Sequence, residues 1–260
     1  MEKIKNHIVS WLKDYVTNAK VEGFVVGISG GIDSAVVSTL CAYTGLKVLC
    51  VEMPIHQAIS QVNRAKEHID FLQNNFSNVE RVEVDLTETF EKMKSVVPTS
   101  DNDALLQLTL ANTRARLRMT TLYYLGGINR LLVAGTGNKV EDFGVGFFTK
   151  YGDGGVDISP IADLMKSDVR KLAAYLDVPV SIQQAAPTDG LFGDDRTDED
   201  QLGASYDELE KAMIAYENGA KADDFSGRER EVFEIFSRLH HINQHKMNPI
   251  PICVIPLDLK

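Results

Sequence analysis

The chain has 260 residues, of which 44% are hydrophobic and 25% charged, and this ordinary composition excludes a disordered, collagen-like or disulfide-dense protein. Lys and Arg number 27 and Asp and Glu 37, so the net charge is −10, a sign that repels nucleic acids and anionic membranes. An anionic ligand must therefore be held by a local site.

The cysteines and the hydropathy indicate a cellular setting. Cys41, Cys50 and Cys253 are odd in number and form no CxxC pair, so the sequence predicts neither a disulfide framework nor a zinc knuckle. No apolar stretch approaches the ~18 residues that a membrane span needs, and the N-terminus carries charges through its apolar positions. We expect a cytoplasmic protein with no nucleic-acid or membrane partner.

The first half of the chain alternates strands and helices. Apolar residues at helical spacing predict an amphipathic helix over 2–19. Apolar runs and helical patterns then predict, in order, a strand at 24–28, a helix at 35–45, a strand at 47–53, a helix at 57–73, a strand at 79–84, a helix at 101–124 and a strand at 131–135.

Buried strands that alternate with helices predict a doubly wound α/β fold, because parallel strands need crossover connections that cover both faces of the sheet. Beyond residue 150 the pattern loosens into a turn-rich stretch, a helix over 167–176, an acidic loop over 187–201, and helices near 205–217 and 227–242. We find no linker, and we expect residues 1–260 to form one domain.

SGGIDS, at residues 29–34, lies between the first strand and its helix. Its glycines let the backbone approach a ligand, and the helix N-terminus presents unpaired N–H groups to an anion. The segment lacks the lysine of GxxxxGK[ST], which argues against a Walker-type phosphate site. The alternative interpretation is a plain glycine turn in which Asp33 and Ser34 cap the helix.

GTGNKVED, at residues 135–142, repeats this arrangement after the fourth strand, with Thr136 able to donate to an anion. Ligands of such sheets lie beyond the carboxyl ends of the strands, where both glycine segments begin. Asp33 and Glu141 would then be neighbours and could hold Mg²⁺, which prefers carboxylates, phosphate oxygens and water. Without SGGIDS, an ordinary strand-to-helix turn with an exposed Glu would be the favoured interpretation of GTGNKVED.

Three further segments carry charges that could orient a polar ligand. In FFTKYGDGGVDISP (147–160) Lys150 and Asp157 flank a glycine-rich loop, although a solvated hairpin has the same composition. Arg116 lies one helical turn after Asn112, in an arginine-rich stretch that could also be a surface stripe. His245 and Lys246 near the C-terminus could bind an anion or simply favour a helix end.

Together with TDEDQLGASYDELE (197–210), these motifs resemble those of the ammonia-dependent NAD synthetases, in the same order and at the usual spacing. SGGIDS alone indicates only the wider ATP pyrophosphatase (PP-loop) superfamily, with its adenine nucleotide alpha hydrolase-like fold, whereas FFTKYGDGGVD is close to a private signature. The resemblance implies a ligase: the nicotinate carboxylate of deamido-NAD attacks the α-phosphorus of ATP, and ammonia then displaces AMP from the acyl-adenylate to give NAD.

The resemblance also implies site residues. Deamido-NAD would contact Arg116, Lys150, Asp157, His245 and Lys246, and Mg²⁺ would bind Asp33 and Glu141. ATP would contact Gly27, Ile28, Ser29, Gly30, Gly31, Ile32, Asp33, Ser34, Thr136, Lys166 and Thr188. Family members are generally homodimers with deamido-NAD at the subunit interface, and a glutamine-dependent version would need a fused amidase domain, which we do not expect here.

Two features depart from expectation. The segment EDFGVGFFTK, from Glu141 to Lys150, is one residue longer than in the family pattern, which puts the local register in question. The acidic residues within 189–200 are unfavourable beside ATP, so we expect them to point outward or to assist Mg²⁺. Two other functions stay open: another ATP pyrophosphatase, such as GMP synthetase or a tRNA-modifying ligase, and a non-catalytic ATP-sensing module.

Overall fold

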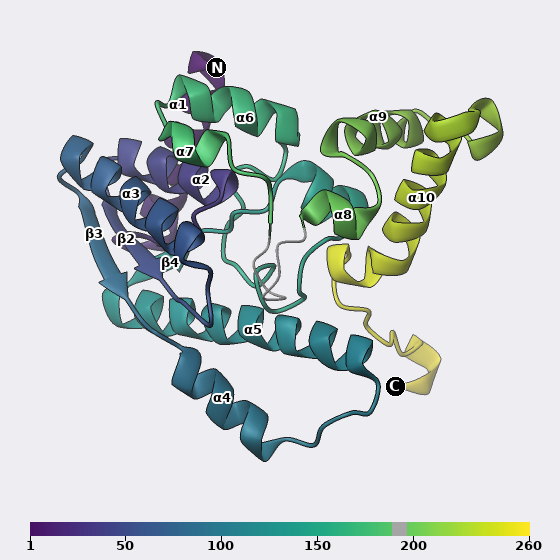
Figure 1. Cartoon of the computed structure of the whole chain (residues 1–260), viewed down its shortest axis with the longest axis horizontal. Helices are drawn as coiled ribbons and strands as arrows, with labels where there is room; N and C mark the ends of the chain where they lie inside the picture. The colour runs from purple at the N-terminus through teal and green to yellow at the C-terminus, as the bar shows by residue number, and fades with distance from the viewer. Residues whose placement is uncertain (189–196) are drawn as a thin grey trace.

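The structure is a computed structural model of the chain that describes residues 1–188 and 197–260 (Figure 1). Its sheet has four parallel strands in the order β3-β2-β1-β4. They are β1 (Gly23–Gly27), β2 (Lys47–Glu52), β3 (Val79–Glu83) and β4 (Leu131–Val133). The predicted α/β class and parallel sheet are confirmed.

The predicted long helices are all present, with boundaries shifted by a few residues. The α-helices are α1 (Glu2–Ala19), α2 (Ile32–Tyr43), α3 (Ile59–Asn75), α4 (Thr87–Val96), α5 (Asp103–Asn129), α6 (Lys166–Tyr175), α7 (Val180–Gln183), α8 (Asp198–Leu202), α9 (Tyr206–Glu217) and α10 (Gly227–Met247). A π-helix, η1, spans Val140–Val145, and short 3₁₀ turns are η2 (Ala222–Asp224) and η3 (Leu257–Leu259).

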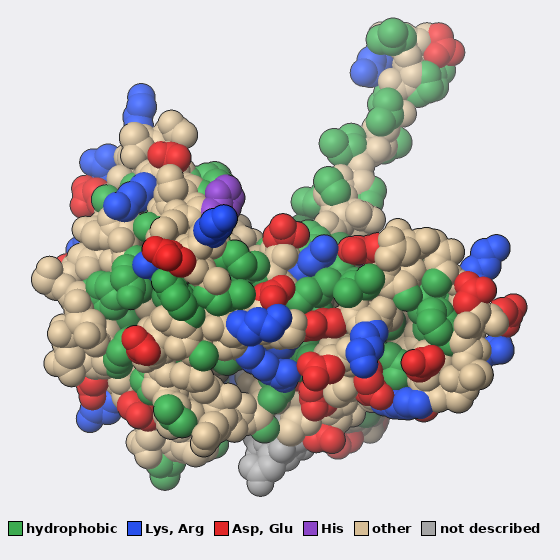
Figure 2. Space-filling view, turned by 90° about the horizontal axis from the view of Figure 1, so that it is seen from above, with side chains coloured by type: hydrophobic (Ala, Val, Ile, Leu, Met, Phe, Trp, Pro, Cys, Tyr) green, Lys and Arg blue, Asp and Glu red, His purple; other side chains and the backbone are tan. Residues whose placement is uncertain are grey.

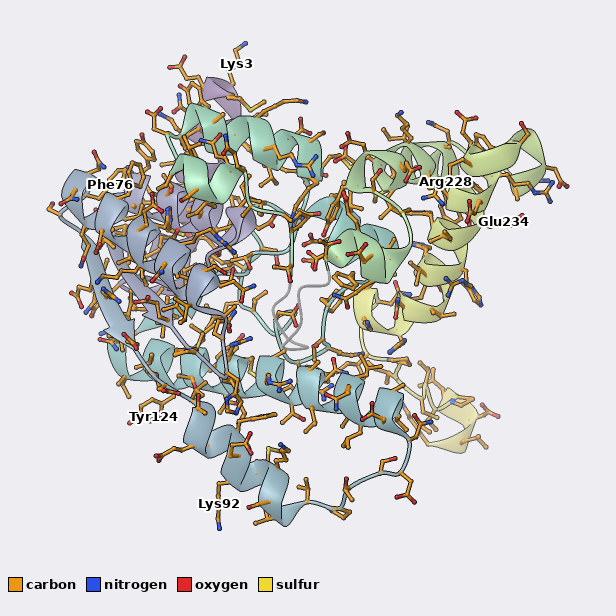
Figure 3. All side chains as sticks on the ribbon, viewed as in Figure 1. Lys3, Phe76, Lys92, Tyr124, Arg228 and Glu234 are labelled. Carbon is orange, nitrogen blue, oxygen red and sulfur yellow. The ribbon has the colours of Figure 1, made fainter. Side chains whose placement is uncertain are left out.

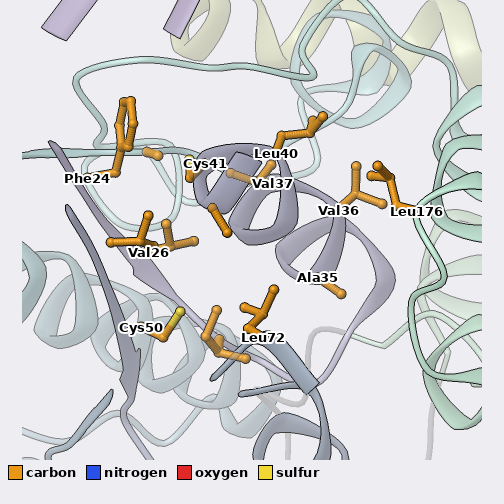
Figure 4. Packing of buried hydrophobic residues seen from close by; sticks show 14 of the residues in the cluster. Phe24, Val26, Ala35, Val36, Val37, Leu40, Cys41, Cys50, Leu72 and Leu176 are labelled. Atoms are coloured by element: carbon orange, nitrogen blue, oxygen red, sulfur yellow. The ribbon is translucent and has the colours of Figure 1, made fainter. Parts of the chain in front are cut away.

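Successive residues of the strands point alternately to two apolar layers, one on each face of the sheet. Phe24 and Val26 of β1 face a core built with α1, α2, α3 and α6, part of which Figure 4 shows around Leu40, whereas Val25 faces the other side. That second layer joins β1, β2 and β4 to apolar residues of α4 and α5. Fully buried parallel strands lack a polar face, which explains their continuous apolar runs.

A third cluster lies apart from the sheet, on the right of Figure 1. It packs η1 between α9 and α10 and is centred on Tyr206, Met213 and Phe236. Carbonyl groups at the end of η1 and in the residues that follow it are thereby brought against α10.

Helix α4 and part of the predicted acidic loop differ from the sequence predictions. Helix α4 was not predicted, because Phe90 is its one buried residue and leaves almost no apolar periodicity. Part of the predicted acidic loop forms α8, which Thr197 and Asp200 stabilise through a capping box. The rest of that loop, 189–196, lies outside the described residues. No helix in the described part of the chain is long and apolar enough to cross a membrane.

Candidate functional site

The chain changes direction within the sheet at β1, because β2 and β3 lie on one side of it and β4 on the other. In open α/β sheets the crevice beyond such a switch point is the usual ligand site. SGGIDS follows β1 and GTGN follows β4, so both glycine segments open onto this crevice, as the sequence predicted.

The SGGIDS bend requires glycine at one position. Gly30 has φ +82°, and a Cβ there would lie 2.5 Å from the carbonyl oxygen of Gln61. The hydroxyls of Ser29 and Ser34 hydrogen-bond each other across the bend at 3.1 Å. Since α2 begins at Ile32 with no side-chain cap at Gly31, its first N–H groups remain directed at the crevice.

We call the space beyond β1 and β4 the nucleotide cavity, which has a volume of about 310 Å³. It is lined by every residue that was expected to contact ATP or metal: Gly27, Ile28, Ser29, Gly30, Gly31, Ile32, Asp33, Ser34, Thr136, Glu141, Lys166 and Thr188. The cavity thus unites segments from both halves of the chain, whose roles toward ATP remain predictions.

Lys166 is the buried cation of this cavity. Its side chain is 3% exposed, and Nζ lies 2.5 Å from Asp33 Oδ2 and 3.0 Å from Glu141 Oε1. Burial lowers its pKa, but the two carboxylates reverse that effect and raise the pKa above its usual value. Lys166 therefore stays charged and paired inside the cavity, although it lies at the start of a helix.

The two carboxylates respond differently to this environment. Burial raises the pKa of Asp33, and Lys166 opposes the shift only in part. Burial would raise the pKa of Glu141 as well, but the Lys166 ammonium and the Tyr206 hydroxyl together bring it below its usual value. Both groups are thus poised around one shared cation.

Each carboxylate also accepts a hydrogen bond from a neutral donor. Asn138 Nδ2 donates to Asp33 Oδ1 at 3.1 Å, and the Tyr206 hydroxyl donates to Glu141 Oε1 at 2.5 Å. The fully buried Tyr206 also reaches Asp198 Oδ2 at 3.3 Å and places its ring 4.7 Å from Lys166 Nζ. Asp198, from the acidic loop, is buried rather than pointing outward.

Asp142 supplies a further acidic group to the cavity. Its carboxyl packs over Gly137, where any Cβ would collide with it. Burial, and then the charges of Glu141, Asp153 and Asp33, raise the pKa of Asp142 to about 8. Most of the Asp142 population is therefore protonated and uncharged at neutral pH.

The donors around Lys166 fit Mg²⁺. Oxygens of Asp33 and Glu141 converge within hydrogen-bonding distance of one cationic atom, which marks a position that favours positive charge. Within residues 1–188 and 197–260, no group of three or more His, Cys, Asp or Glu side chains forms a metal cage. Mg²⁺ in phosphoryl-transfer sites commonly binds one or two carboxylates, with water and substrate phosphates completing the octahedron.

We call the five residues expected to hold deamido-NAD, Arg116, Lys150, Asp157, His245 and Lys246, the substrate-side cluster. None of them lines the nucleotide cavity as the described residues form it. Arg116 of α5 donates to the Lys150 carbonyl at 3.3 Å, and the Lys150 ammonium donates to the His245 carbonyl. The fold thus joins α5, the 147–160 segment and α10 here.

Side chains of α10 hydrogen-bond to backbone carbonyl groups at the end of η1 and in the residues that follow it. Lys246 Nζ donates to Gly146 O at 2.8 Å and to Phe148 O at 2.9 Å, and Asn243 Nδ2 donates to Val145 O at 2.8 Å. His240 Nδ1 lies 2.7 Å from Gly144 O. Because burial is the main influence on it, the pKa of the Lys246 ammonium is lowered.

Asp157 lies at the β4 edge of this region. Its carboxylate accepts hydrogen bonds from the backbone N–H of Val133 at 2.8 Å and from the Tyr123 hydroxyl at 2.9 Å. The residue is nevertheless exposed on its outer side. Two hydrogen bonds therefore hold the Asp157 carboxylate in place.

Comparisons with known proteins fit this geometry. A sequence profile of the NAD synthase family matches residues 4–250. The NH3-dependent NAD(+) synthetase of Mesoplasma florum is 38% identical over 254 residues, with 95% of each chain covered. The chain belongs to the NAD synthase family.

Two solved structures support the membership. The NMN synthetase of Francisella tularensis has a TM-score of 0.81 and 31% identity, with 98% of each chain covered. The NH3-dependent NAD synthetase of Campylobacter jejuni has a TM-score of 0.78 and 26% identity, covering 97% of this chain and 99% of that one. The family assignment made from the motifs is confirmed.

Sequence reasoning missed several residues of this NAD synthase family member. Arg118, Gln57, Gln61 and Arg64 line the nucleotide cavity, and Tyr206 and Asn138 hold the carboxylates. Asn138 and Tyr206 both lie within quoted motifs, GTGN and TDEDQLGASYDELE. The signals in the sequence that could have indicated them are the amide of Asn138 within a glycine-rich segment and the hydroxyl of Tyr206 within an acidic one.

Proposed function

We propose that this protein is an ammonia-dependent NAD synthetase, a ligase that amidates deamido-NAD with consumption of ATP. The observation that carries the proposal is the convergence of SGGIDS, Glu141 and Lys166 on one cavity at the switch point, in a chain of this family. The products are NAD, AMP and pyrophosphate.

The chemistry explains why two anions must be brought together. A carboxylate resists attack by ammonia because oxide is a poor leaving group, so an oxygen of the nicotinate carboxylate first attacks the α-phosphorus and pyrophosphate departs. Ammonia then forms the C–N bond, AMP leaves with the bridging oxygen, and one proton is released. The substrate carboxylate is already ionised at neutral pH, so the first step needs no general base.

In this proposal the residues of the chain act chiefly by positioning and by charge. The N–H groups at the start of α2 and the Lys166 ammonium bind ATP phosphates, with Thr136 and Thr188 beside them. Asp33 and Glu141 would hold Mg²⁺, which supplies charge neutralisation to the departing pyrophosphate. Arg116, Lys150, Asp157, His245 and Lys246 would orient deamido-NAD.

We also propose a homodimer with deamido-NAD near the subunit interface. Tyr124, on the outer side of α5 in Figure 3, and the neighbouring Ile128 are more than half exposed. The C-terminal segment stands away from the body in Figure 2 and exposes Ile252 and Leu257. Sedimentation of the purified protein tests the assembly, and a monomer at micromolar concentration would contradict it.

We propose a cytoplasmic setting, in keeping with three unpaired cysteines.

The activity is tested by incubating the protein with ATP, Mg²⁺, ammonium and deamido-NAD and measuring NAD and AMP. Nicotinate mononucleotide is tested in parallel, because a similar structure is that of an NMN synthetase and both substrates offer the same carboxylate. AMP formation only with the mononucleotide would move the proposal to that substrate. ATP binding without AMP under either condition would favour a sensing module.

The two-step order has its own test. With deamido-NAD present and ammonia withheld, labelled pyrophosphate should exchange into ATP, because the acyl-adenylate forms reversibly. Product formation without any such exchange would instead indicate a concerted route.

A further inference from the structure

One cation occupies the position at which two proposed metal ligands meet. Lys166 Nζ lies between Asp33 Oδ2 and Glu141 Oε1, at 2.5 and 3.0 Å, with only 3% of its side chain exposed. A Mg²⁺ ion that used these oxygens would therefore have to displace the ammonium, since two cations at one buried position repel each other strongly.

The Lys166 ammonium offsets the repulsion between two carboxylates that lie close together. Asp33 and Glu141 are close to each other and poorly exposed, and an unpaired buried carboxylate is strongly destabilising. Lys166 pairs with both and offsets one of the two negative charges. This pairing uses two of the three N–H donors of the ammonium that is proposed to bind ATP, so the same side chain serves both sites.

We infer that Lys166 is a built-in counter-ion that fills the metal position until ATP phosphates draw its ammonium away, so that Asp33 and Glu141 bind Mg²⁺ only together with nucleotide. This inference rests on the proposed function, because it takes from it the partners of Lys166, Asp33 and Glu141. Metal and nucleotide binding are then linked through one side chain.

The surroundings allow the exchange without losing the position of the carboxylates. Asn138 is fully buried and holds Asp33 Oδ1, while its own side-chain oxygen accepts from the backbone N–H of Glu141 at 3.2 Å. Tyr206 holds Glu141 Oε1. When the ammonium leaves, each carboxylate keeps a neutral donor and stays aimed at the vacated position.

Lys166 itself is well placed to move. It is the first residue of α6, and its long side chain reaches into a cavity that the SGGIDS bend also lines. A nucleotide phosphate bound at that bend would offer the ammonium a new anionic partner a short distance from its present one.

Binding of Mn²⁺, used as the probe for Mg²⁺ and measured by electron paramagnetic resonance without nucleotide, tests the inference. The wild-type protein should bind Mn²⁺ weakly. Lys166→Met should bind one Mn²⁺ at least about tenfold more tightly, because removal of a competing charge is worth 1.4 kcal/mol or more. Lys171→Met, on the exposed side of the same helix, is the matched control and should behave as wild type.

A double variant assigns the gain to this position. Lys166→Met combined with Glu141→Gln should lose the added Mn²⁺ affinity, since one of the two converging carboxylates is gone. Equal Mn²⁺ affinities in wild-type protein and Lys166→Met, or a gain that persists in the double variant, would overturn the inference.

Lys166→Met leaves two buried carboxylates unpaired and can fail to fold without metal. Thermal unfolding of Lys166→Met and of Lys166→Gln, whose amide can still donate to Asp33, is therefore measured with and without Mn²⁺. The inference requires a larger Mn²⁺-induced rise in Tm in the variants than in wild type, and no difference in either variant would overturn it.

The test separates this inference from the proposed function. If wild-type protein makes NAD but the Lys166 variants gain no Mn²⁺ affinity, the counter-ion role alone is wrong. If wild-type protein makes no amide product while the variants do gain Mn²⁺ affinity, the counter-ion role holds and the proposed activity is wrong.

Discussion

The nucleotide cavity and the substrate-side cluster hold their charged side chains in different ways. In the cavity Lys166 is paired with side chains, Asp33 and Glu141, from the segments after β1 and β4. In the substrate-side cluster Lys150 and Lys246 donate to backbone carbonyls. The first arrangement is fixed by residue identity, whereas the second depends on where one loop lies against α10.

This difference teaches which part is preorganised. In the cavity Lys166 is buried and is paired with both Asp33 and Glu141, so the geometry of these charges exists before any ligand binds. The substrate-side cations are more exposed and can exchange a carbonyl for a substrate anion at little cost. Substitutions in the cavity should therefore have the larger effects.

The largest expected effect is on Asp33. Asp33→Asn removes a charge from both Lys166 and the proposed Mg²⁺ site, and losing one such electrostatic contact lowers kcat by about 10²–10³-fold. Initial rates of NAD formation at saturating ATP measure it. Asp168→Asn, whose carboxylate pairs with Lys171 on the surface, serves as control. Near-wild-type rates for Asp33→Asn would remove it from the site.

Acid should weaken the scaffold of the cavity through His68. This buried imidazole on α3 contacts Ser38 of α2 at 2.8 Å, and burial lowers its pKa from 6.5 to about 4. A base with a lowered folded-state pKa stabilises the fold fully above pH 6.5, and this contribution is lost as the pH falls toward 4.

The loss amounts to about 3 kcal/mol of unfolding free energy, at 1.36 kcal/mol for each pKa unit. Denaturant unfolding of wild type and His68→Gln at several pH values between 7 and 4 measures it, and the variant should have the flatter pH profile. Parallel profiles would contradict the assignment to His68.

The SGGIDS bend offers a sharper comparison between two glycines. Gly30→Ala and Gly45→Ala both introduce a Cβ at positive φ, which costs about 1–2 kcal/mol. Only at Gly30 does the new Cβ meet a neighbour, the Gln61 carbonyl, whereas nothing lies within 4 Å at Gly45. Gly30→Ala should therefore be the less stable variant and should alone raise the KM for ATP. Equal KM values would show that the bend does not contact nucleotide.

The smallest expected effect is on the substrate side. Lys150→Met should raise the KM for deamido-NAD about tenfold, the low end for a hydrogen bond from a charged donor, and leave the KM for ATP unchanged. Steady-state kinetics with each substrate varied measures both constants, and Lys211→Met on the exposed side of α9 is the control. A parallel rise in both constants would mean that the two regions are not separate.

The sequence was informative where short-range pattern decides structure. The strand, bend and helix around Gly30 could be read directly, because apolar runs and glycine act over a few residues. The meeting of Lys166 with Asp33 joins residues 133 positions apart. The resemblance implied that both contact ATP and that Asp33 also binds metal, but it implied no contact between the two side chains. Their direct pairing appears only in three dimensions.

Other parts of the candidate site left no readable pattern. Lys246 and Asn243 donate to backbone carbonyl groups, which every residue carries, so no side-chain type in the sequence indicates where these contacts form. Tyr206 fits an ordinary buried position at the start of a helix, and its contacts with Glu141, Asp198 and Lys166 distinguish it only in three dimensions. Helix α4 was not predicted because its single buried residue, Phe90, creates no helical repeat of apolar residues.

The π-helix η1 has a consequence for how chains of this family can differ in length. A π turn closes over one more residue than an α turn. η1 contains Glu141 and ends at Val145, inside the interval from Glu141 to Lys150 that the resemblance to the family pattern predicts to be one residue longer here. We expect the wider turn to absorb such a residue as a local bulge, so that both ends of the interval keep the same neighbours.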